Sequence, residues 1–379
     1  PRRAPRARSA PGGGEGTRRA VPLVVLGFGQ VGRALVRQVL ATRRLHAARL
    51  GLCLDVVAVC DRSGAVVEPR GLSDAQLATL LEAKAGGTPL RESAGGYEPG
   101  DLVAMLESAA RAGSIVVDCT ASDETARVLL AALERGYGVV LANKKPLAGT
   151  QEDFSRLTAT PRLRYEATVG AGLPVISTLR SLLDTGDEVN AIEGAFSGTL
   201  GYLCSELEQG VPFAAAVRAA YELGYTEPDP REDLSGADVA RKALILARSL
   251  GWTLAMADIP VESLYPANLQ SLPVSQFLEA IAALDTPFAM RVSLARANRA
   301  VLRYQAEVKG EQARVRMAAV PQDHPLGRLR GTDNLILFHT ARYRSSPLVI
   351  QGPGAGVEVT AAGVLADVLA VSGSLQMTS

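Results

Sequence analysis

Residues 22–32 read PLVVLGFGQVG, and this stretch decides the fold of the first part of the chain. Its first five residues form an apolar run that predicts a buried strand and leads directly into a GxGxxG pattern, Gly27, Gly29 and Gly32. Apolar residues at helical spacing follow over positions 31–40. In such a strand–turn–helix unit the glycines permit a tight turn, a close approach to a pyrophosphate, and packing of the helix on the strand. The stretch therefore predicts a dinucleotide site.

Three more apolar runs follow, and each ends in polar residues. They are residues 55–60, 114–117 and 138–141, with a helical pattern over 124–135 between the last two. Strands alternating with helices, with loops at the strand carboxyl ends, are typical of a doubly wound parallel sheet. We therefore predict an α/β, Rossmann-type dinucleotide-binding domain over residues 21–160.

The pattern changes beyond residue 160 to an α+β arrangement. Strands are predicted at 189–196, 335–343 and 348–350, helices at 200–208, 213–223 and 237–250, and a hairpin at 300–320. We predict a substrate-binding and dimerisation domain over 161–345. A glycine-rich turn at 352–356 and an alanine-rich helix then predict that the C-terminal segment, 346–379, returns to the nucleotide-binding domain.

The first twenty residues differ from the rest, with six arginines, one acid and a Pro-Gly-Gly-Gly run. A segment without apolar residues to bury is expected to be disordered, so we predict an Arg/Gly/Pro-rich tail over 1–20. It has no apolar signal region. We expect the protein in the cytoplasm, or in the plastid stroma if this tail is a transit remnant; an interdomain linker is the other interpretation.

Composition narrows the classes of partner. A formal net charge of +1 provides no field for nucleic acid or acidic membranes, so we expect neither as a partner. No apolar run is predicted to be long enough to span a membrane, and the run at 243–254 is interrupted by Arg248. The four cysteines and three histidines are scattered, which weighs against a metal cluster or a histidine-based triad.

The chemistry is concentrated in residues 224–242, GYTEPDPREDLSGADVARK. Glu227 and Asp233 lie in a proline-stiffened loop, and Asp238 and Lys242 are four residues apart, on one face of the following helix. Carboxylates beside a lysine can hold a small cationic substrate and transfer a proton. The structural alternative is a surface ion pair, with Ser235 starting the helix in a capping-box-like pair.

Two other positions bear on the cofactor. Asp61 ends the second strand, where an acid binds the ribose hydroxyls of NAD, but its neighbour Arg62 could hold the 2′-phosphate of NADP. Lys144 follows the fourth strand, at the sheet edge where ligands bind, and could contact a cofactor phosphate or a substrate carboxylate. Its alternative is a solvated loop lysine.

Two small-residue turns also allow two interpretations. Residues 166–174, EATVGAGLP, can expose carbonyls that coordinate a hard cation together with Glu166, or form only a packed turn between domains. Residues 197–199, SGT, form a substrate-contacting loop or the N-cap of the next helix.

Taken together, these motifs resemble homoserine dehydrogenase over about residues 21–379. The resemblance is carried by 143–145, 166–174, 185–188, 192–194, 196–200, 224–242 and 351–356. It implies NAD(P)H-dependent interconversion of L-aspartate 4-semialdehyde and L-homoserine, in threonine, methionine and isoleucine biosynthesis. It further implies a small-molecule substrate, a homodimer and, in bifunctional members, an aspartate kinase module upstream.

The resemblance also assigns residues. It implies that Lys242 is the catalytic proton donor and that the substrate contacts Glu227, Asp238, Asp233 and Thr199. Cofactor contacts fall on Gly27, Phe28, Gly29, Gln30, Val31, Gly32, Thr120, Lys144, Gly224 and Gly356. A sodium site falls on Glu166, Val169, Ala171 and Leu173. The expected cofactor is NADP, with NAD as the alternative, and the choice between them stays open because residues 61–112 show little of the family pattern. The rival interpretations are another two-domain NAD(P)-dependent semialdehyde or hydroxy-acid dehydrogenase and a non-catalytic nucleotide-binding regulator.

Overall fold

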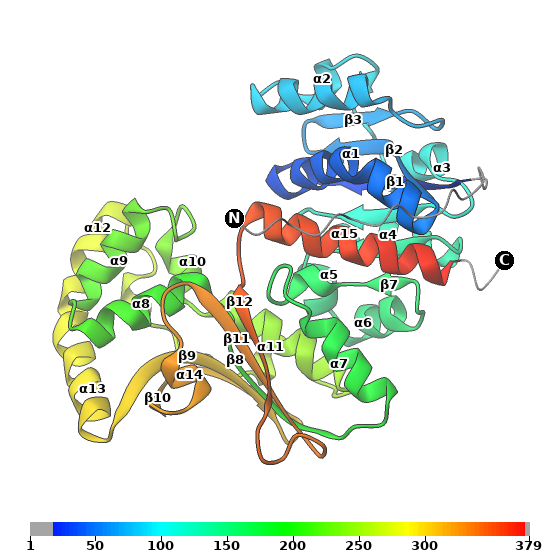
Figure 1. The fold of residues 1–379 in the computed structure, drawn as a ribbon. Coiled ribbons are helices and arrows are strands. Elements are labelled where there is room, and N and C mark those ends of the chain that lie inside the picture. The colour runs from blue at the N-terminus through cyan, green and yellow to red at the C-terminus, as the bar shows by residue number, and fades with distance from the viewer. Residues whose placement is uncertain (1–17, 376–379) are drawn as a thin grey trace, which may run out of the picture.

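The computed structural model describes residues 18–375, which form two β-sheets with helices around them (Figure 1). The first strand, β1, spans Arg19–Leu26. The predicted disordered tail therefore reaches two residues too far, because Arg19 and Ala20 pair in register with Leu52 and Cys53 of the next strand. The rest of that tail, up to residue 17, lies outside the described residues.

The first sheet has seven strands in the order β4-β3-β2-β1-β5-β6-β7. Besides β1, these are β2 Leu52–Asp61, β3 Gly64–Val67, β4 Gly96–Tyr97, β5 Ile115–Asp118, β6 Gly138–Leu141 and β7 Leu163–Arg164. The strands β2, β1, β5, β6 and β7 are parallel, whereas β3 and β4 are antiparallel additions at one edge. The predicted Rossmann-type parallel sheet is confirmed, and the antiparallel edge was not predicted.

The strand order places a ligand-binding crevice. From β1 the chain first adds β2 on one side and later β5 on the other side. Loops that leave β1 and β5 at their carboxyl ends therefore diverge to opposite faces and open a crevice between them, where doubly wound sheets bind ligands. The glycine turn follows β1 and Cys119-Thr120 follows β5, so both border this crevice.

Two long helices cover one face of this sheet side by side, α1 Gln30–Leu50 and α15 Val357–Ser374 (Figure 1). Leu35 and Val39 of α1 and Val364 and Val368 of α15 share one core with the strands. The α15 helix alone, among residues 18–375, has the length and apolar composition of a membrane span, so the expectation that no run reaches that length was wrong. Its buried residues explain the composition, since they belong to the core.

The other helices of this half are shorter. They are α2 Asp74–Ala85, α3 Leu102–Ala109, α4 Ala126–Glu134, α5 Lys145–Ala148 and α6 Gln151–Thr158, and α7 Val175–Asp184 leads to the second sheet. Residues of α3, α4 and α6 pack in a second hydrophobic core with the apolar strand residues that do not face α1 and α15. The first sheet is therefore covered on both faces, as expected for parallel strands.

The second sheet is antiparallel, in the order β10-β9-β8-β11-β12. Its strands are β8 Val189–Ala195, β9 Ala300–Lys309, β10 Gln312–Pro321, β11 Asp333–Thr340 and β12 Leu348–Pro353. The predicted hairpin is confirmed, with Lys309 paired to Gln312 across a two-residue turn. The first sheet extends to Arg164 and this sheet to Pro353, each beyond the predicted boundaries at residues 160 and 345.

Helices surround the second sheet unevenly (Figure 1). They are α8 Gly198–Gln209, α9 Phe213–Glu222, α10 Pro230–Leu234, α11 Ala237–Ser249, α12 Val274–Ala280, α13 Asp285–Ala297 and α14 Pro325–Arg328. The α11 helix contacts β9 and β10 of its own sheet and α5 of the nucleotide-binding half. This helix is therefore shared by both halves, and it carries Asp238 and Lys242.

Candidate active site

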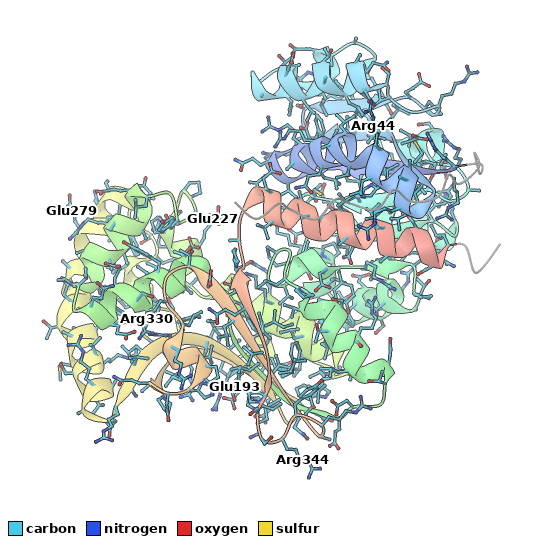
Figure 2. All side chains as sticks on the ribbon, viewed as in Figure 1. Arg44, Glu193, Glu227, Glu279, Arg330 and Arg344 are labelled. Atoms are coloured by element: carbon cyan, nitrogen blue, oxygen red, sulfur yellow. The ribbon has the colours of Figure 1, made fainter. Side chains whose placement is uncertain are left out.

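A cavity of about 450 Å³ lies between the carboxyl edge of the first sheet and the second domain. It brings together ten of the predicted site residues: Val31, Thr120, Lys144, Ala171, Thr199, Glu227, Asp233, Asp238, Lys242 and Gly356. Glu227 lies on the side of the second domain that faces the nucleotide-binding half (Figure 2). The cavity wall does not include Gly27, Phe28, Gly29, Gln30, Gly32, Gly224, Glu166, Val169 or Leu173.

The glycine turn after β1 is shaped by backbone contacts. A Cβ on Gly27, which has φ +90°, would lie 2.6 Å from the carbonyl carbon of Cys119, and one on Gly32 would lie 2.1 Å from the Gly27 carbonyl oxygen. A Cβ on Gly29 would meet nothing within 4 Å. The first and third glycines are thus required by packing, while the open space over the second leaves room for a phosphate at the start of α1.

Phe28, which the resemblance gives as a cofactor contact, lies in the glycine turn between β1 and α1. Its side chain is fully buried in the core, and its N–H, like that of Gly27, donates to the carbonyl oxygen of Cys60. Neither group is free for a ligand. The first residues of α1, Gln30 and Val31, carry the helix N-terminus that can bind a phosphate instead.

A buried carboxylate organises the loop after β5. Asp118, with no exposed surface, accepts hydrogen bonds from the Thr120 N–H at 2.9 Å, from Thr125 at 2.6 Å and from the Asn143 amide at 3.1 Å. These bonds tie the loops after β5 and β6 together. Lys144, which follows Asn143 and caps α5, is thereby fixed at the rim of the crevice.

The centre of the site is an ion triad of Asp238 with two lysines. The Lys242 Nζ lies 2.8 Å from Asp238 Oδ2, and the Lys144 Nζ lies 3.2 Å from Asp238 Oδ1. The Lys242 Nζ also donates to the Phe196 carbonyl oxygen at 2.6 Å, at the end of β8. Burial opposes the charge of Asp238, but the two ammonium groups outweigh it and hold the pKa of Asp238 well below its usual range.

Lys242 is placed for proton transfer. It is 8% exposed, so its ammonium is held within the protein at the cavity wall. An ammonium has three N–H donors, and the Phe196 carbonyl and Asp238 use two of them. The third donor remains for an oxygen atom of a ligand in the cavity.

The loop before α10 and α10 itself add further carboxylates, with Glu227 in the loop and Glu232 and Asp233 on the helix. Glu227, Glu232 and Asp233 line the cavity beside Asp238, and the Glu227 N–H donates to Asp233 Oδ2 at 2.8 Å. Partial burial, together with the neighbouring carboxylates, raises the pKa of Glu227, and burial likewise raises the pKa of Asp233. A group of acids that repel one another is stabilised by an added cation, so this corner suits an ammonium group.

Arg231 anchors this acidic loop. Asp229 caps α10 by accepting the Arg231 N–H, and the Arg231 guanidinium donates to Asp229 and to the carbonyls of Gln270 and Leu272, both at 2.6 Å. Thr199 completes the corner, because its hydroxyl donates to the Tyr225 carbonyl oxygen at 2.5 Å. Ser197 caps α8, so the predicted N-cap is present and the same turn also lines the cavity.

The start of α11 differs from the predicted capping box. The N-cap is Gly236, with φ +73°, where a Cβ would lie 1.9 Å from the Tyr304 hydroxyl oxygen. Ser235 instead ends α10 and accepts only the Ala237 N–H, at 3.2 Å. Asp238 is therefore free to bond both lysines rather than the backbone.

At the far end of the crevice, Asp61 is already paired. Lys84 Nζ lies 2.7 Å from Asp61 Oδ2, and the Ser63 N–H donates to Asp61 Oδ1 at 2.7 Å. Although burial opposes it, these bonds lower the pKa of Asp61. Arg62 is exposed and forms no ion pair within residues 18–375.

In residues 166–174, the segment predicted to bind a cation, Glu166 is already hydrogen-bonded to other parts of the chain. Both Glu166 carboxylate oxygens accept N–H groups from the start of α7, Ile176 at 2.6 Å and Ser177 at 2.9 Å. The Glu166 N–H donates to Asp367 of α15 at 2.7 Å. The chain then turns at Ala171, which has φ +55°. Glu166 thus caps α7 in this structure, and it belongs to both interpretations of the segment.

Sequence reasoning missed some cavity residues. Arg241, three residues after Asp238 on α11, lines the cavity, and helical spacing could have indicated it. Tyr225 and Cys119 also line it. Burial raises the pKa of the Cys119 thiol, which favours the less reactive protonated form.

Comparisons with known proteins agree with this geometry. A family model described as homoserine dehydrogenase, NAD binding domain, matches residues 27–165, and one described as homoserine dehydrogenase matches residues 174–369. The homoserine dehydrogenase of Emericella nidulans is 38% identical over 367 residues, which are 92% of this chain and 97% of that protein. A crystal structure of a homoserine dehydrogenase described as putative, from Archaeoglobus fulgidus, is 28% identical, has a TM-score of 0.74, and is matched over 92% of this chain and 98% of its own.

Some relatives are longer. A bifunctional aspartokinase/homoserine dehydrogenase from Zea mays is 38% identical over 363 residues, which are 93% of this chain but 38% of that protein. The chain thus spans about two fifths of such relatives and corresponds to their dehydrogenase portion. With both halves matched, the chain belongs to the homoserine dehydrogenase family, whose members are NAD(P)-dependent oxidoreductases acting on a CH–OH group.

Proposed function

We propose that this chain interconverts L-aspartate 4-semialdehyde and L-homoserine with a nicotinamide cofactor. The observation that carries the proposal is the position of Lys242, whose ammonium is held by Asp238 and the Phe196 carbonyl with one donor left for the cavity. The glycine turn and the open space over Gly29 fit a dinucleotide on the opposite side of the same cavity. When bound, the nicotinamide cofactor supplies the hydride that the aldehyde carbon receives.

The protein's own residues supply the proton and the orientation. Lys242 donates a proton to the aldehyde oxygen as negative charge develops there, and the product is the alcohol. In the reverse direction Lys242 accepts the hydroxyl proton. Glu227 and Asp233 bind the substrate's ammonium group, and this fixes the distance from that group to the reacting carbon.

Replacing Lys242 tests the proton-transfer role. We expect Lys242→Met to lower kcat by roughly 10²- to 10⁴-fold, the usual contribution of a general acid–base group. Binding of the cofactor, measured by fluorescence titration, should stay close to wild type because Lys242 lies on the substrate side. Lys309→Met, which changes an exposed lysine at the end of β9, is the matched control. Near-wild-type turnover by the Lys242 variant would show that the assignment is wrong.

Glu227 should control the pH dependence of substrate binding. Only the ionised carboxylate attracts an ammonium, and the pKa of Glu227 is raised, so kcat/KM for homoserine should begin to fall at a higher pH than for an ordinary glutamate. We expect Glu227→Gln to raise the KM for homoserine roughly 10- to 100-fold, the loss of one charged hydrogen bond. Initial rates across pH measure both effects, with exposed Glu222→Gln as control. Equal losses of homoserine and cofactor binding would contradict the assignment.

We further propose NADP as the preferred cofactor. Asp61, the acid that would bind the ribose hydroxyls of NAD, is already bonded to Lys84 and Ser63. Arg62 next to it is exposed and forms no ion pair within the described chain. A phosphate placed there would find a free guanidinium, which binds phosphate in a bidentate manner.

Arg62→Ala separates the two cofactors. We expect the KM for NADP to rise roughly 10- to 100-fold, since a charged hydrogen bond is lost, and the KM for NAD to change little. Steady-state rates with each cofactor at saturating homoserine provide the measurement. Arg70→Ala, another exposed arginine of the same region, serves as control. Parallel loss with both cofactors would refute the NADP preference.

A sodium ion is also proposed in the turn after β7. Within residues 18–375, the carbonyl oxygens of Val169 and Ala171 accept no hydrogen bond, while those of Gly170 and Leu173 do. Free carbonyls in a sharp turn beside the Glu166 carboxylate are donors that suit a hard cation. Leu173 fits less well, because its carbonyl already accepts the Val175 N–H at 2.8 Å.

Sodium should therefore stabilise the protein. In sodium chloride we expect the thermal unfolding midpoint to exceed that in choline chloride of equal ionic strength by roughly a few degrees, since only the folded chain forms the turn. Scanning calorimetry in the two salts measures the difference. Identical midpoints at all concentrations would rule out the site.

The implied homodimer remains a proposal as well. Met290 and Leu294, four residues apart on α13, are 68% and 67% exposed and offer an apolar patch to a second copy. Sedimentation velocity of the wild type and of Met290→Glu tests it, and a wild type that stays monomeric at micromolar concentration would refute it.

A further inference from the structure

Arg248, in the last turn of α11, is a buried cation without a counter-ion. It is 3% exposed and forms no ion pair with any residue from 18 to 375. Its Nη1 donates to the Leu147 carbonyl oxygen at 2.8 Å, and its Nε donates to the Leu254 carbonyl oxygen at 3.0 Å. The guanidinium carbon lies 5.7 Å from the centre of the Phe154 ring. Among the described residues, the groups that stabilise its charge are therefore two backbone carbonyls and the face of one aromatic ring.

Such an arrangement is a poor way to stabilise a fold. Removing a guanidinium from water is costly, and an apolar side chain of similar size often packs at lower cost. What carbonyl hydrogen bonds provide, and apolar packing does not, is a defined position of the bonded groups. The partner that matters is Leu147, because it belongs to α5 in the other half of the molecule.

The two helices are joined at two points. At its start, α11 bonds α5 through Asp238 and Lys144, the N-cap of α5. At its end, it bonds α5 through Arg248 and Leu147. Asp238 and Arg248 are separated by ten residues, about 15 Å along a helix at about 1.5 Å per residue. Two contacts so far apart on one helix prevent α5 from sliding or rotating relative to α11.

A neighbouring hydrogen bond strengthens the same end. The Ser249 hydroxyl lies 2.9 Å from the Tyr165 hydroxyl, just after β7 of the nucleotide-binding half. The end of α11 is thus held by two residues of that half, Leu147 and Tyr165. At the start of α11, within the described residues, the side-chain bond to the nucleotide-binding half is the Lys144–Asp238 ion pair.

We propose that Arg248 is a positioning residue for the reaction: by holding the Leu147 carbonyl it sets α5 against α11, so that Lys144 meets Asp238 and Asp238 orients Lys242. The inference rests on the proposed function of Lys242. Arg248 touches no reacting atom and lies at the opposite end of α11 from the ion triad. A substitution of Arg248 should therefore change turnover by displacing Lys144.

A double-mutant cycle on kcat tests this dependence. We expect Arg248→Met to lower kcat about tenfold or more in the wild-type background, with a smaller change in the KM for homoserine. In a Lys144→Met background the same substitution should change kcat less than twofold, because the residue it positions is already gone. If the two effects multiply independently, the proposal is overturned. Arg248→Lys, which keeps one donor for Leu147, should recover part of the lost kcat.

Arg303 provides the matched control. It is 2% exposed and donates to the carbonyls of Leu326, Gly327 and Leu329 at 3.0, 2.9 and 2.8 Å, and, unlike Arg248, it also pairs with Glu208 of α8 at 2.8 Å, so that all of these partners belong to the second domain. Arg303→Met should lower the unfolding midpoint, and its effect on kcat should be the same with Lys144 or Met at position 144. A coupling as large as that of Arg248 would overturn the proposal.

Hydrogen exchange gives a readout that does not depend on turnover. We expect Arg248→Met to speed amide exchange in residues 145–149 and 236–242, at both partners of the ion pair, whereas Arg303→Met leaves these segments unchanged. Unchanged exchange in both segments of the Arg248 variant would overturn the proposal. A wild type that binds cofactor but does not turn over homoserine would instead count against the proposed function, and the exchange result would still decide the role of Arg248.

Discussion

The ion triad of Lys144, Asp238 and Lys242 is the constraint on which the functional arrangement depends. It joins a loop of the parallel sheet to the first turn of a helix in the second domain, with N–O distances of 3.2 and 2.8 Å. One carboxylate between two ammonium groups is a strong electrostatic arrangement, because each lysine lowers the cost of holding Asp238 ionised. The same carboxylate joins the two halves through Lys144 and orients Lys242, the residue proposed as the proton donor.

The sequence predicted the fold wherever a segment's own pattern was sufficient. The parallel strands β1, β2, β5 and β6, the β9–β10 hairpin and α11 were predicted from apolar periodicity and turn residues, with ends shifted by a few residues, whereas the two-residue strand β7 was not predicted. The antiparallel edge strands β3 and β4 were missed because they are short and paired only through the wider sheet. The start of α11 was assigned to Ser235, although the close approach of Tyr304, far along the chain, requires glycine at position 236. The helix-capping preference of the local sequence gives no information about a contact with a residue so far along the chain.

The sequence indicated which residues lie at the cavity better than it indicated which contacts those residues form. Lys242 and Asp238 followed from helical spacing, but the second lysine on Asp238 comes from a loop on another sheet, and no local pattern relates the two. The resemblance gave Phe28 as a cofactor contact, and the motif alone did not indicate that its side chain is buried in the core. Glu166 was read as a metal ligand, and its first use here is to cap α7. The motifs predicted which residues lie near one another. The packing of the folded chain decides which atoms of each residue remain able to bind a ligand.

Positive and negative charges lie on opposite sides of the cavity, and the fold explains this arrangement. The N-termini of α1 and α15 both point toward the cavity through the turns at Gly29 and Gly356, and they provide partial positive charge without any side chain. Across from them, the loop before α10 and α10 itself provide the carboxylates of Glu227, Glu232 and Asp233, and partial burial together with repulsion among these groups raises the pKa of Glu227. An anionic ligand is favoured on the side of the parallel sheet and an ammonium on the side of the second domain. Lys242 lines the same cavity, so the proton transfer proposed for it would take place between these two regions.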